Sequence, residues 1–385
     1  MKFSILLPTR ERLEYLRLAV ESVLRQDAED WQLVVADNCS QQDIGGYIAS
    51  LADPRIVYTR SESPLPVTEN WNRALAHSEG EYVVMLGDDD ALLGGYLRRM
   101  RELIERFDDP EVIYTKALLF TYPGVDPGRP EGFLMDHGCA RFFDGASQPF
   151  LLEHERAVAL VRAAMSFRLR FDFNAQFALV SRRLIDRLGA FGAFYQSAFP
   201  DYYSMNAAFL DAQRIVVDPE PKVVIGVTPK SYGYFHANRR EGEGRAFLDG
   251  PEAGEAPGSN INVGWLNAVQ TLASGPGARY GLKVNERRYR LVQAAHVHRG
   301  LREGSVSAEQ LRRVERELPA AERWAYRGAA ALLAGLHRLL PQRLKEPMVN
   351  LTTRAVGQLP TIHPAIVAGR YRDMLEVLAA RSPTP

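Results

Sequence analysis

The chain has 385 residues, of which 46% are hydrophobic and 24% are charged, a composition typical of globular proteins. Basic and acidic residues are balanced at 47 each, so no net charge attracts a polyanion such as nucleic acid. The length allows two or three domains. The two cysteines, Cys39 and Cys139, show no CxxC or Cys/His spacing, which argues against a zinc site and a disulfide scaffold.

The start of the chain shows no pattern of a secretory signal. Met1 and Lys2 lead into a short apolar stretch, residues 3–7, which Pro8 ends before it reaches the length of a signal-peptide core. No uncharged run approaches the roughly 20 residues that a membrane-spanning helix needs. We therefore expect a cytoplasmic protein, whose contact with a membrane would be peripheral and at the inner face.

The first hundred residues alternate short aliphatic runs with longer stretches of helical period. This pattern predicts an α/β domain in which helices flank a mostly parallel sheet. The predicted strands are apolar on both faces, as expected for strands buried between helices, and they span residues 3–8, 32–36, 55–59 and 82–86. The predicted helices between and after them span residues 13–24, 68–77 and 95–107.

Beyond residue 110 the pattern is less regular. Residues 123–145 are rich in Gly, Pro and Asp, which predicts a long loop that could form one lip of a cleft. A helix over residues 151–165 and a strand over 177–180 follow. The predicted domains are an N-terminal domain over residues 1–240, a flexible loop or linker over 241–260, and a helical C-terminal region over 261–385.

Three consecutive carboxylates, Asp88, Asp89 and Asp90, directly follow the strand predicted at 82–86. Ligands of open parallel sheets bind beyond the carboxyl ends of the strands. Adjacent carboxylates raise one another's pKa unless a cation or hydrogen-bond donors compensate them. Mg²⁺ and Mn²⁺ prefer oxygen ligands and often bridge carboxylates to phosphates, so the triplet predicts a divalent metal site. The alternative is a solvated acidic turn before a helix, whose first turn favours negative charge.

Polar residues also end the neighbouring predicted strands. Pro8, Thr9 and Arg10 follow the first strand, and Asp37 follows the second. An Asp after the second strand can hydrogen-bond a base or a ribose hydroxyl, although an isolated Asp is more often a turn former or a helix cap. Neither GxGxxG nor GxxxxGK[ST] occurs, so these strand ends predict a nucleotide whose phosphates are held by a metal.

Three segments, SILLPTRER, VVADNCS and NWNRALAHSEGEYVVMLGDDDALL, resemble the inverting family 2 glycosyltransferases of the GT-A fold. The resemblance is close over residues 1–110 and continues loosely to about residue 240. It implies that residues 1–240 bind a nucleotide-sugar and transfer its sugar to a hydroxyl of a glycan or a lipid-linked acceptor. It further implies Mn²⁺ or Mg²⁺ as cofactor and a role in bacterial surface polysaccharide synthesis.

The resemblance also assigns residues to the donor nucleotide. Pro8 and Arg10, with Thr9 between them, fall where the family lines its nucleotide pocket. Asp37 falls where a carboxylate contacts the base. Asn72 lies in the stretch that passes under the donor, although it could equally be a helix cap or a residue at the edge of the core.

Within the acidic triplet the resemblance assigns Asp88 to the ribose side and Asp89 to the metal. Asp90 could equally be the metal ligand if the triplet is taken as a strict Asp-x-Asp motif. Many members of the family place an Asp where Gly87 stands here, so the alignment leaves two registers open.

The resemblance also implies a carboxylate that deprotonates the acceptor hydroxyl. The segment FPDYY resembles the acidic motif at the start of the acceptor-side helix, which makes Asp201 the predicted catalytic base. An exposed Asp has a pKa of about 3.9 and is ionised at neutral pH. Asp201 could instead be an N-terminal helix charge after Pro200, and Asp172 is the alternative base.

A late histidine, His236, falls where many GT-A enzymes bring a histidine to the metal or the diphosphate. Neutral imidazole is an acceptable Mn²⁺ ligand, although a lone histidine after aromatic residues is as often structural. Arg239 and Arg240 follow on a Gly-rich stretch and could close over a bound diphosphate.

Residues 324–345 predict an amphipathic helix with a basic side. Such a stripe can pack on the core, form the contact of a homo-oligomer, or lie on a membrane surface. The last interpretation would suit a lipid-linked acceptor.

Two other functions fit parts of the sequence. A sugar nucleotidyltransferase uses a similar sheet but would have a Gly-rich, basic loop after the first strand, and the segment from Pro8 to Arg12 lacks glycines. A non-catalytic module could bind glycan or nucleotide without turnover. The complete acidic set argues against it.

Overall fold

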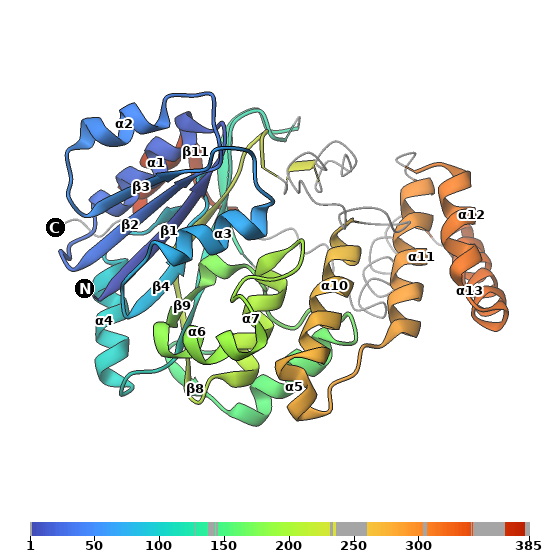
Figure 1. The fold of residues 1–385 in the computed structure, drawn as a ribbon. Coiled ribbons are helices and arrows are strands. Elements are labelled where there is room, and N and C mark those ends of the chain that lie inside the picture. Colours follow the sequence, from blue (N-terminus) through green and yellow to red (C-terminus); the bar gives the residue numbers. More distant parts are fainter. Residues whose placement is uncertain are drawn as a thin grey trace.

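The computed structural model describes residues 2–126, 128–137, 143, 145–231, 234–235, 260–302, 306–339, 341 and 366–381. Figure 1 shows a central twisted sheet with helices packed around it, and a group of C-terminal helices to one side. Three residues predicted for the site, His236, Arg239 and Arg240, lie outside the described residues, as does nearly all of the predicted linker at 241–260.

One mixed sheet of 11 strands runs through the described residues. Its strands are β1 (Phe3–Thr9), β2 (Trp31–Asp37), β3 (Ile56–Arg60), β4 (Tyr82–Met85), β5 (Ala91–Leu92), β6 (Val112–Thr121), β7 (Gly132–Asp136), β8 (Phe150–Leu152), β9 (Ala178–Ser181), β10 (Ile215–Val227) and β11 (Ile366–Tyr371).

The α-helices are α1 (Leu13–Leu24), α2 (Ile44–Leu51), α3 (Val67–Ala76), α4 (Tyr96–Arg106), α5 (His154–Ala164), α6 (Arg182–Leu188), α7 (Pro200–Asp211), α10 (Asn260–Ser274), α11 (Glu286–Arg302), α12 (Ala308–Glu317), α13 (Ala320–Leu339) and α15 (Met374–Arg381). Three short 3₁₀ helices are η2 (Ala175–Phe177), η3 (Gly189–Phe191) and η5 (Pro276–Tyr280).

The predicted α/β class is confirmed, and the first four predicted strands form as one parallel unit. β1 pairs in parallel with both β2 and β4, and β2 pairs in parallel with β3. The aliphatic residues of β1, β2 and β4 are buried because helices cover the sheet, whereas those of β3 are partly buried. The parallel register places Thr9 opposite Asp37, so the carboxyl ends of β1 and β2 meet at one edge.

Beyond β4 the sheet becomes mixed. β9 pairs antiparallel with β4 and with β6, and β10 runs parallel to β6 while its end pairs antiparallel with β5. β10 is hard to recognise in the sequence because Asp218, Glu220 and two prolines interrupt its apolar residues. The register shifts at this interruption, where Arg99 pairs with the buried Asp218 at 2.8 Å.

The structure corrects two sequence-based predictions. Residues 132–136, predicted as part of a long loop, form β7. The region 261–385, predicted to be helical, contributes β11, which pairs antiparallel with β7. The helix that follows, α15, packs against α1. β11 is not recognisable alone, because its partner lies more than two hundred residues away in the chain. β7 also pairs antiparallel with the nearby β6.

The C-terminal helices connect to the sheet domain through α10, which packs on α7. The contact is close at Gly264, where a Cβ atom would lie 1.9 Å from the Phe199 ring. Along α13, Trp324, Leu332 and Leu339 are exposed, which agrees with the predicted apolar stripe as far as the described residues extend. No helix in the described residues is both long and apolar enough to span a membrane.

Candidate active site

The acidic triplet lies at the edge where β1, β2 and β4 end, and all three aspartates are buried. Thr9 Oγ1 donates to Asp88 Oδ2 at 2.7 Å. The Arg12 guanidinium lies 2.9 Å from Asp88 Oδ1 and 3.4 Å from Asp89 Oδ2. A protein cation therefore compensates the two carboxylates, a role that the sequence-based prediction gave only to a metal. The only indication of this role in the sequence was that Arg12 lies three residues after Thr9, close to the end of the first strand.

Protein donors hold both carboxylate oxygens of Asp90, the other predicted metal ligand of the triplet. Its Oδ2 accepts hydrogen bonds from the Gly87 backbone N–H at 3.0 Å and from Gln176 Nε2 at 2.9 Å. Its Oδ1 accepts from the Gly226 N–H at 2.8 Å. A side chain on residue 87 would point into this carboxylate, because a Cβ there would lie 2.4 Å from Asp90 Oδ2. Asp90 thus fills the space that a side chain on residue 87 would take and ties three segments together.

Asp89 is the member of the triplet that fits a divalent cation best. Burial raises its pKa to about 6, and the neighbouring Asp88 raises it further while Arg12 opposes the shift. Both oxygens of Asp88 are already engaged by Thr9 and Arg12. Among the described residues no group of three or more His, Cys, Asp or Glu side chains converges on one point. Mg²⁺ at phosphates often uses one or two carboxylates plus water and phosphate oxygens, so Asp89 suffices for this type of site.

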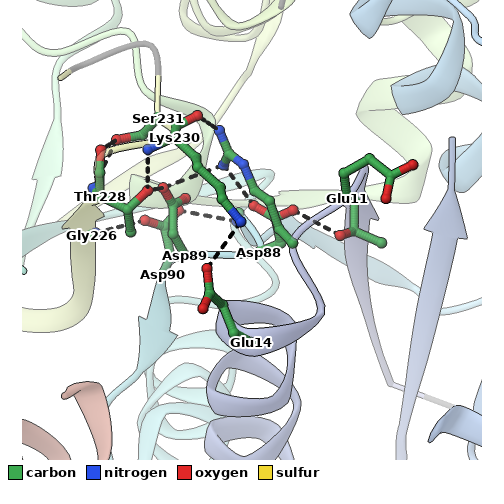
Figure 2. Close-up of polar contacts among 12 residues, drawn as sticks. Glu11, Glu14, Asp88, Asp89, Asp90, Gly226, Thr228, Lys230 and Ser231 are labelled. Carbon is green, nitrogen blue, oxygen red and sulfur yellow. Dashed lines mark hydrogen bonds and ion pairs between the residues drawn. The ribbon is translucent and has the colours of Figure 1, made fainter. Parts of the chain in front are cut away.

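The end of β10 closes over the triplet, as Figure 2 shows. Gly226 approaches so closely that a Cβ would lie 1.8 Å from the Asp89 carbonyl oxygen. Thr228 Oγ1 lies 3.4 Å from Asp89 Oδ2, and Lys230 Nζ pairs with Glu14 at 3.0 Å. The Lys230 carbonyl accepts a hydrogen bond from Arg12. This segment had no signal in the sequence, because its role arises from a contact across about 140 residues.

Asp37 lies at the same edge but is almost fully buried, with 1% of its surface exposed. Its Oδ1 accepts from the Ser40 backbone N–H at 3.0 Å, and its Oδ2 accepts from the Tyr58 hydroxyl at 2.8 Å. Burial and this hydrogen bond raise the pKa of Tyr58 to about 12. Arg60 Nε adds an ion pair at 3.5 Å. Asp37 thus organises the loops that surround it, and the predicted contact with a base stays a prediction.

The amide of Asn72 is held by backbone groups. Its Nδ2 donates to the Thr68 and Tyr195 carbonyls at 3.0 and 2.8 Å, and its Oδ1 accepts from the Tyr195 N–H at 3.2 Å. The amide therefore ties α3 to the loop that leads into α7, and its predicted place under the donor stays a prediction. Pro8 and Arg10, both half-buried, end β1 as predicted.

The predicted base, Asp201, lies in the first turn of α7 after Pro200. It is not the freely exposed carboxylate that the sequence analysis assumed. Burial raises its pKa to about 7, and the charge of Asp172 raises it further. The Tyr202 backbone N–H donates to Asp201 Oδ1 at 3.0 Å, so the helix-start interpretation is correct too. The two candidate bases are therefore neighbours.

Asp172 has a second titratable neighbour that the sequence analysis missed. His137 Nε2 lies 3.6 Å from Asp172 Oδ2, and its ring packs edge-on against Phe177. Its Nδ1 is buried and has no hydrogen-bond partner in the described residues. Asp172 Oδ1 accepts from the Asn174 N–H at 3.0 Å. Two aspartates and a histidine thus gather beside the start of α7.

A short segment joins the two acidic clusters. The charge of Asp172 acts on Asp201 and raises its pKa. Gln176, four residues after Asp172, donates a hydrogen bond to Asp90. Four residues of fully extended chain span at most about 14 Å. The strand-end triplet and the acids at α7 are thus connected through the short segment from Asp172 to Gln176.

Comparison with known proteins concerns the first part of the chain. Residues 4–125, which contain most of β1 to β6 and the acidic triplet, match the sequence model described as glycosyl transferase family 2. The match spans less than half of the chain. The predicted resemblance is thereby confirmed for the domain that carries the strand-end carboxylates.

Two curated relatives match the family 2 domain. One, from Escherichia coli K12, is named "Putative colanic acid biosynthesis glycosyl transferase WcaA" and is 35% identical over 89 residues, which are 23% of this chain and 32% of the relative. The other is the GalNAc(5)-diNAcBac-PP-undecaprenol β-1,3-glucosyltransferase of Campylobacter jejuni, 33% identical over 104 residues, which are 26% of this chain and 34% of the relative. The matches thus span about a third of the length of these relatives.

Among solved structures, TarS 1–349 of S. aureus in complex with UDP-GlcNAc is similar to this chain with a TM-score of 0.48 and 15% identity. The similarity covers 86% of this chain and 88% of that one.

Proposed function

We propose that this protein is an inverting glycosyltransferase that moves a sugar from a nucleoside-diphosphate-sugar to a hydroxyl of a glycan or lipid-linked acceptor. The observation that carries the proposal is the connection between two acidic sites. Asp88 and Asp89 stand at the strand ends of a family 2 domain, and Asp201 stands across the linking segment with a pKa raised to about 7.

The pKa of Asp201 suits a general base. A base works best when its pKa lies near the working pH, because it must be ionised yet hold the proton well. In the proposed reaction Asp201 accepts the proton of the acceptor hydroxyl while that oxygen forms a bond to the anomeric carbon. The bond from that carbon to the diphosphate oxygen breaks, and its electron pair leaves with the nucleoside diphosphate. One displacement of this kind inverts the anomeric configuration.

The donor side must compensate the charge of the leaving diphosphate. Asp89 would hold Mn²⁺ or Mg²⁺, which when bound would neutralise negative charge on the phosphates. Arg12 is the protein cation at the same carboxylates and holds Asp88 in place. Thr9 fixes the other oxygen of Asp88, so the carboxylate on the predicted ribose side has one orientation.

The names of two relatives support the proposed acceptor class. One is named for colanic acid biosynthesis, and the other is named for an acceptor linked to undecaprenol through PP. By analogy we place this protein in surface polysaccharide synthesis at the inner face of the membrane. The exposed Trp324, Leu332 and Leu339 of α13 support a peripheral contact there.

The test is release of sugar from a panel of nucleoside-diphosphate-sugars, measured with Mn²⁺, with Mg²⁺ and with a chelator. We expect at least one donor to be hydrolysed slowly, only with metal, and to be hydrolysed at least tenfold more slowly by Asp89→Asn. The matched control is Glu105→Gln, which removes an exposed carboxylate of α4 and should leave hydrolysis unchanged. A wild-type protein that binds donor without any turnover would instead be a non-catalytic module.

A further inference from the structure

A pocket of about 500 Å³ opens between the end of α5 and the start of α11. Its volume lies in the range of small-molecule sites. Ser166 and Asn285 contribute to its wall, but its main feature is charge. Five arginines line it: Arg162, Arg168, Arg170, Arg287 and Arg288.

Three of these arginines lack the acidic partners that many other described arginines have. In the described part of the chain, no carboxylate forms an ion pair with Arg162, Arg168 or Arg170. Arg287 has one at 3.8 Å, to Glu322, which pairs more closely with Arg290 at 3.0 Å. The arginines are close enough to affect one another. Burial lowers the pKa of Arg288, and the positive charges of Arg168 and Arg170 lower it further.

A concave surface with several uncompensated cations raises the local concentration of anions. Arginine is suited to phosphate in particular, because its planar fork donates two parallel hydrogen bonds to two oxygens of one group. The start of α11, a helix of 17 residues, also lines the pocket through Arg287, and the positive end of a helix dipole favours negative charge. Asn285, just before the helix, caps it by accepting from the Arg288 N–H at 3.0 Å. A carboxylate has two oxygens and can pair with one guanidinium in this way, whereas a phosphate or diphosphate has enough oxygens to pair with several.

The arginine pocket is connected along the chain to the residues proposed for the acceptor side of the active site. Arg168 and Arg170 belong to the segment that leads directly into Asp172. Phe171, between them, stacks on Phe209 of α7 with ring centroids 4.3 Å apart. Phe173 packs on Tyr202 of the same helix at 5.1 Å. The helix that carries Asp201 therefore also anchors the arginine segment.

From these observations we infer that the arginine pocket binds a phosphate or diphosphate group of the acceptor while the acceptor hydroxyl lies at Asp201. The inference rests on the proposed function for the identity of the ligand as an acceptor. The two sources of such a group are a glycan carried on a prenyl diphosphate and a soluble glycan with phosphodiester links, and both present the same chemistry to the arginines.

The first experiment measures binding of inorganic pyrophosphate by calorimetry, with a chelator present so that no metal assists the acidic triplet. We expect wild type to bind, and the double variant Arg162→Ala/Arg168→Ala to bind at least tenfold more weakly. Both substituted residues are exposed, so the fold should persist. The matched control, Arg156→Ala/Arg312→Ala, removes two exposed arginines outside the pocket and should bind as wild type does.

The second experiment measures the KM for each of the two acceptor types with the same proteins. The inference predicts that KM for the acceptor in use rises at least tenfold in Arg162→Ala/Arg168→Ala, while metal-dependent donor hydrolysis is unchanged. The inference would be overturned if wild type did not bind pyrophosphate. It would also be overturned if the double variant had the same pyrophosphate affinity or the same acceptor KM as wild type. A protein that sediments with phosphatidylglycerol vesicles through these arginines, but does not bind pyrophosphate, would also overturn the inference. In that case the arginine pocket would bind a membrane surface.

Failure of the proposed function gives a different result. In that case wild type hydrolyses no nucleotide-sugar, whatever the arginines do. Pyrophosphate binding that depends on the arginines could still occur, and it would show an anion site without an acceptor role, which contradicts the inference as stated.

Discussion

At the scale of single residues, similar side chains at the site have different roles, and burial with partners decides between them. Asp88, Asp89 and Asp90 are adjacent, yet Asp90 is held by three protein donors and Asp88 by Thr9 and Arg12. Sequence reasoning located the triplet but could not choose its register, because the deciding contacts come from Gly226 and Gln176. It also proposed both Asp201 and Asp172 without showing that they are neighbours.

The first residue-scale prediction concerns pH. The pKa of Asp201 is raised to about 7 by burial and by Asp172, and only the ionised form can accept a proton, so kcat/KM for transfer should rise with pH through a midpoint near 7. Asp172→Asn removes a like charge, which lowers the pKa of Asp201 and should move the midpoint to lower pH while transfer persists. The pH profiles of the two proteins check this. Loss of transfer in Asp172→Asn would identify Asp172 as the base.

At the scale of elements, the N-terminal strands were predictable because each is a continuous apolar run followed by a polar turn. β10 was not, although it covers the triplet, because Asp218 and the prolines divide it into two runs. β7 and β11 were missed because a strand of five or six residues is defined by its partner. Elements that depend on local pattern were thus visible in the sequence, and elements that depend on distant pairing were not.

The element-scale prediction concerns the close contact between β10 and the acidic loop. Gly226→Ala would place a Cβ 1.8 Å from the Asp89 carbonyl oxygen, so β10 must shift and weaken the Gly226 hydrogen bond to Asp90. We expect a loss of about 1 to 3 kcal/mol in the free energy of unfolding, measured by denaturant titration, with weaker nucleoside diphosphate binding. Gly189→Ala, where nothing lies within 4 Å of the added carbon, is the control and should be near neutral.

At the scale of the whole molecule, the fold connects the residues proposed for the donor and for the acceptor, which come from distant parts of the chain. The family 2 segment, residues 4–125, supplies the strand-end acids, whereas Asp172 and Asp201 come from the following segments. α10 packs on α7, and β11 returns the C-terminal region to the sheet edge, so this region is integrated with the catalytic domain. The predicted boundary at residues 241–260 therefore separates segments of sequence that are in contact in the fold.

The most direct test of the account compares sugar transfer and nucleoside diphosphate affinity in Asp201→Asn. Asn keeps the size of the side chain but cannot take the acceptor proton, and a general base contributes about 10²- to 10⁴-fold to rate. The proposed donor residues, Asp88 and Asp89, lie in the loop before β5 and not on α7. The account predicts that transfer falls at least a hundredfold while affinity for nucleoside diphosphate with Mn²⁺ stays within about twofold of wild type. Transfer close to the wild-type rate in a folded Asp201→Asn protein would contradict it.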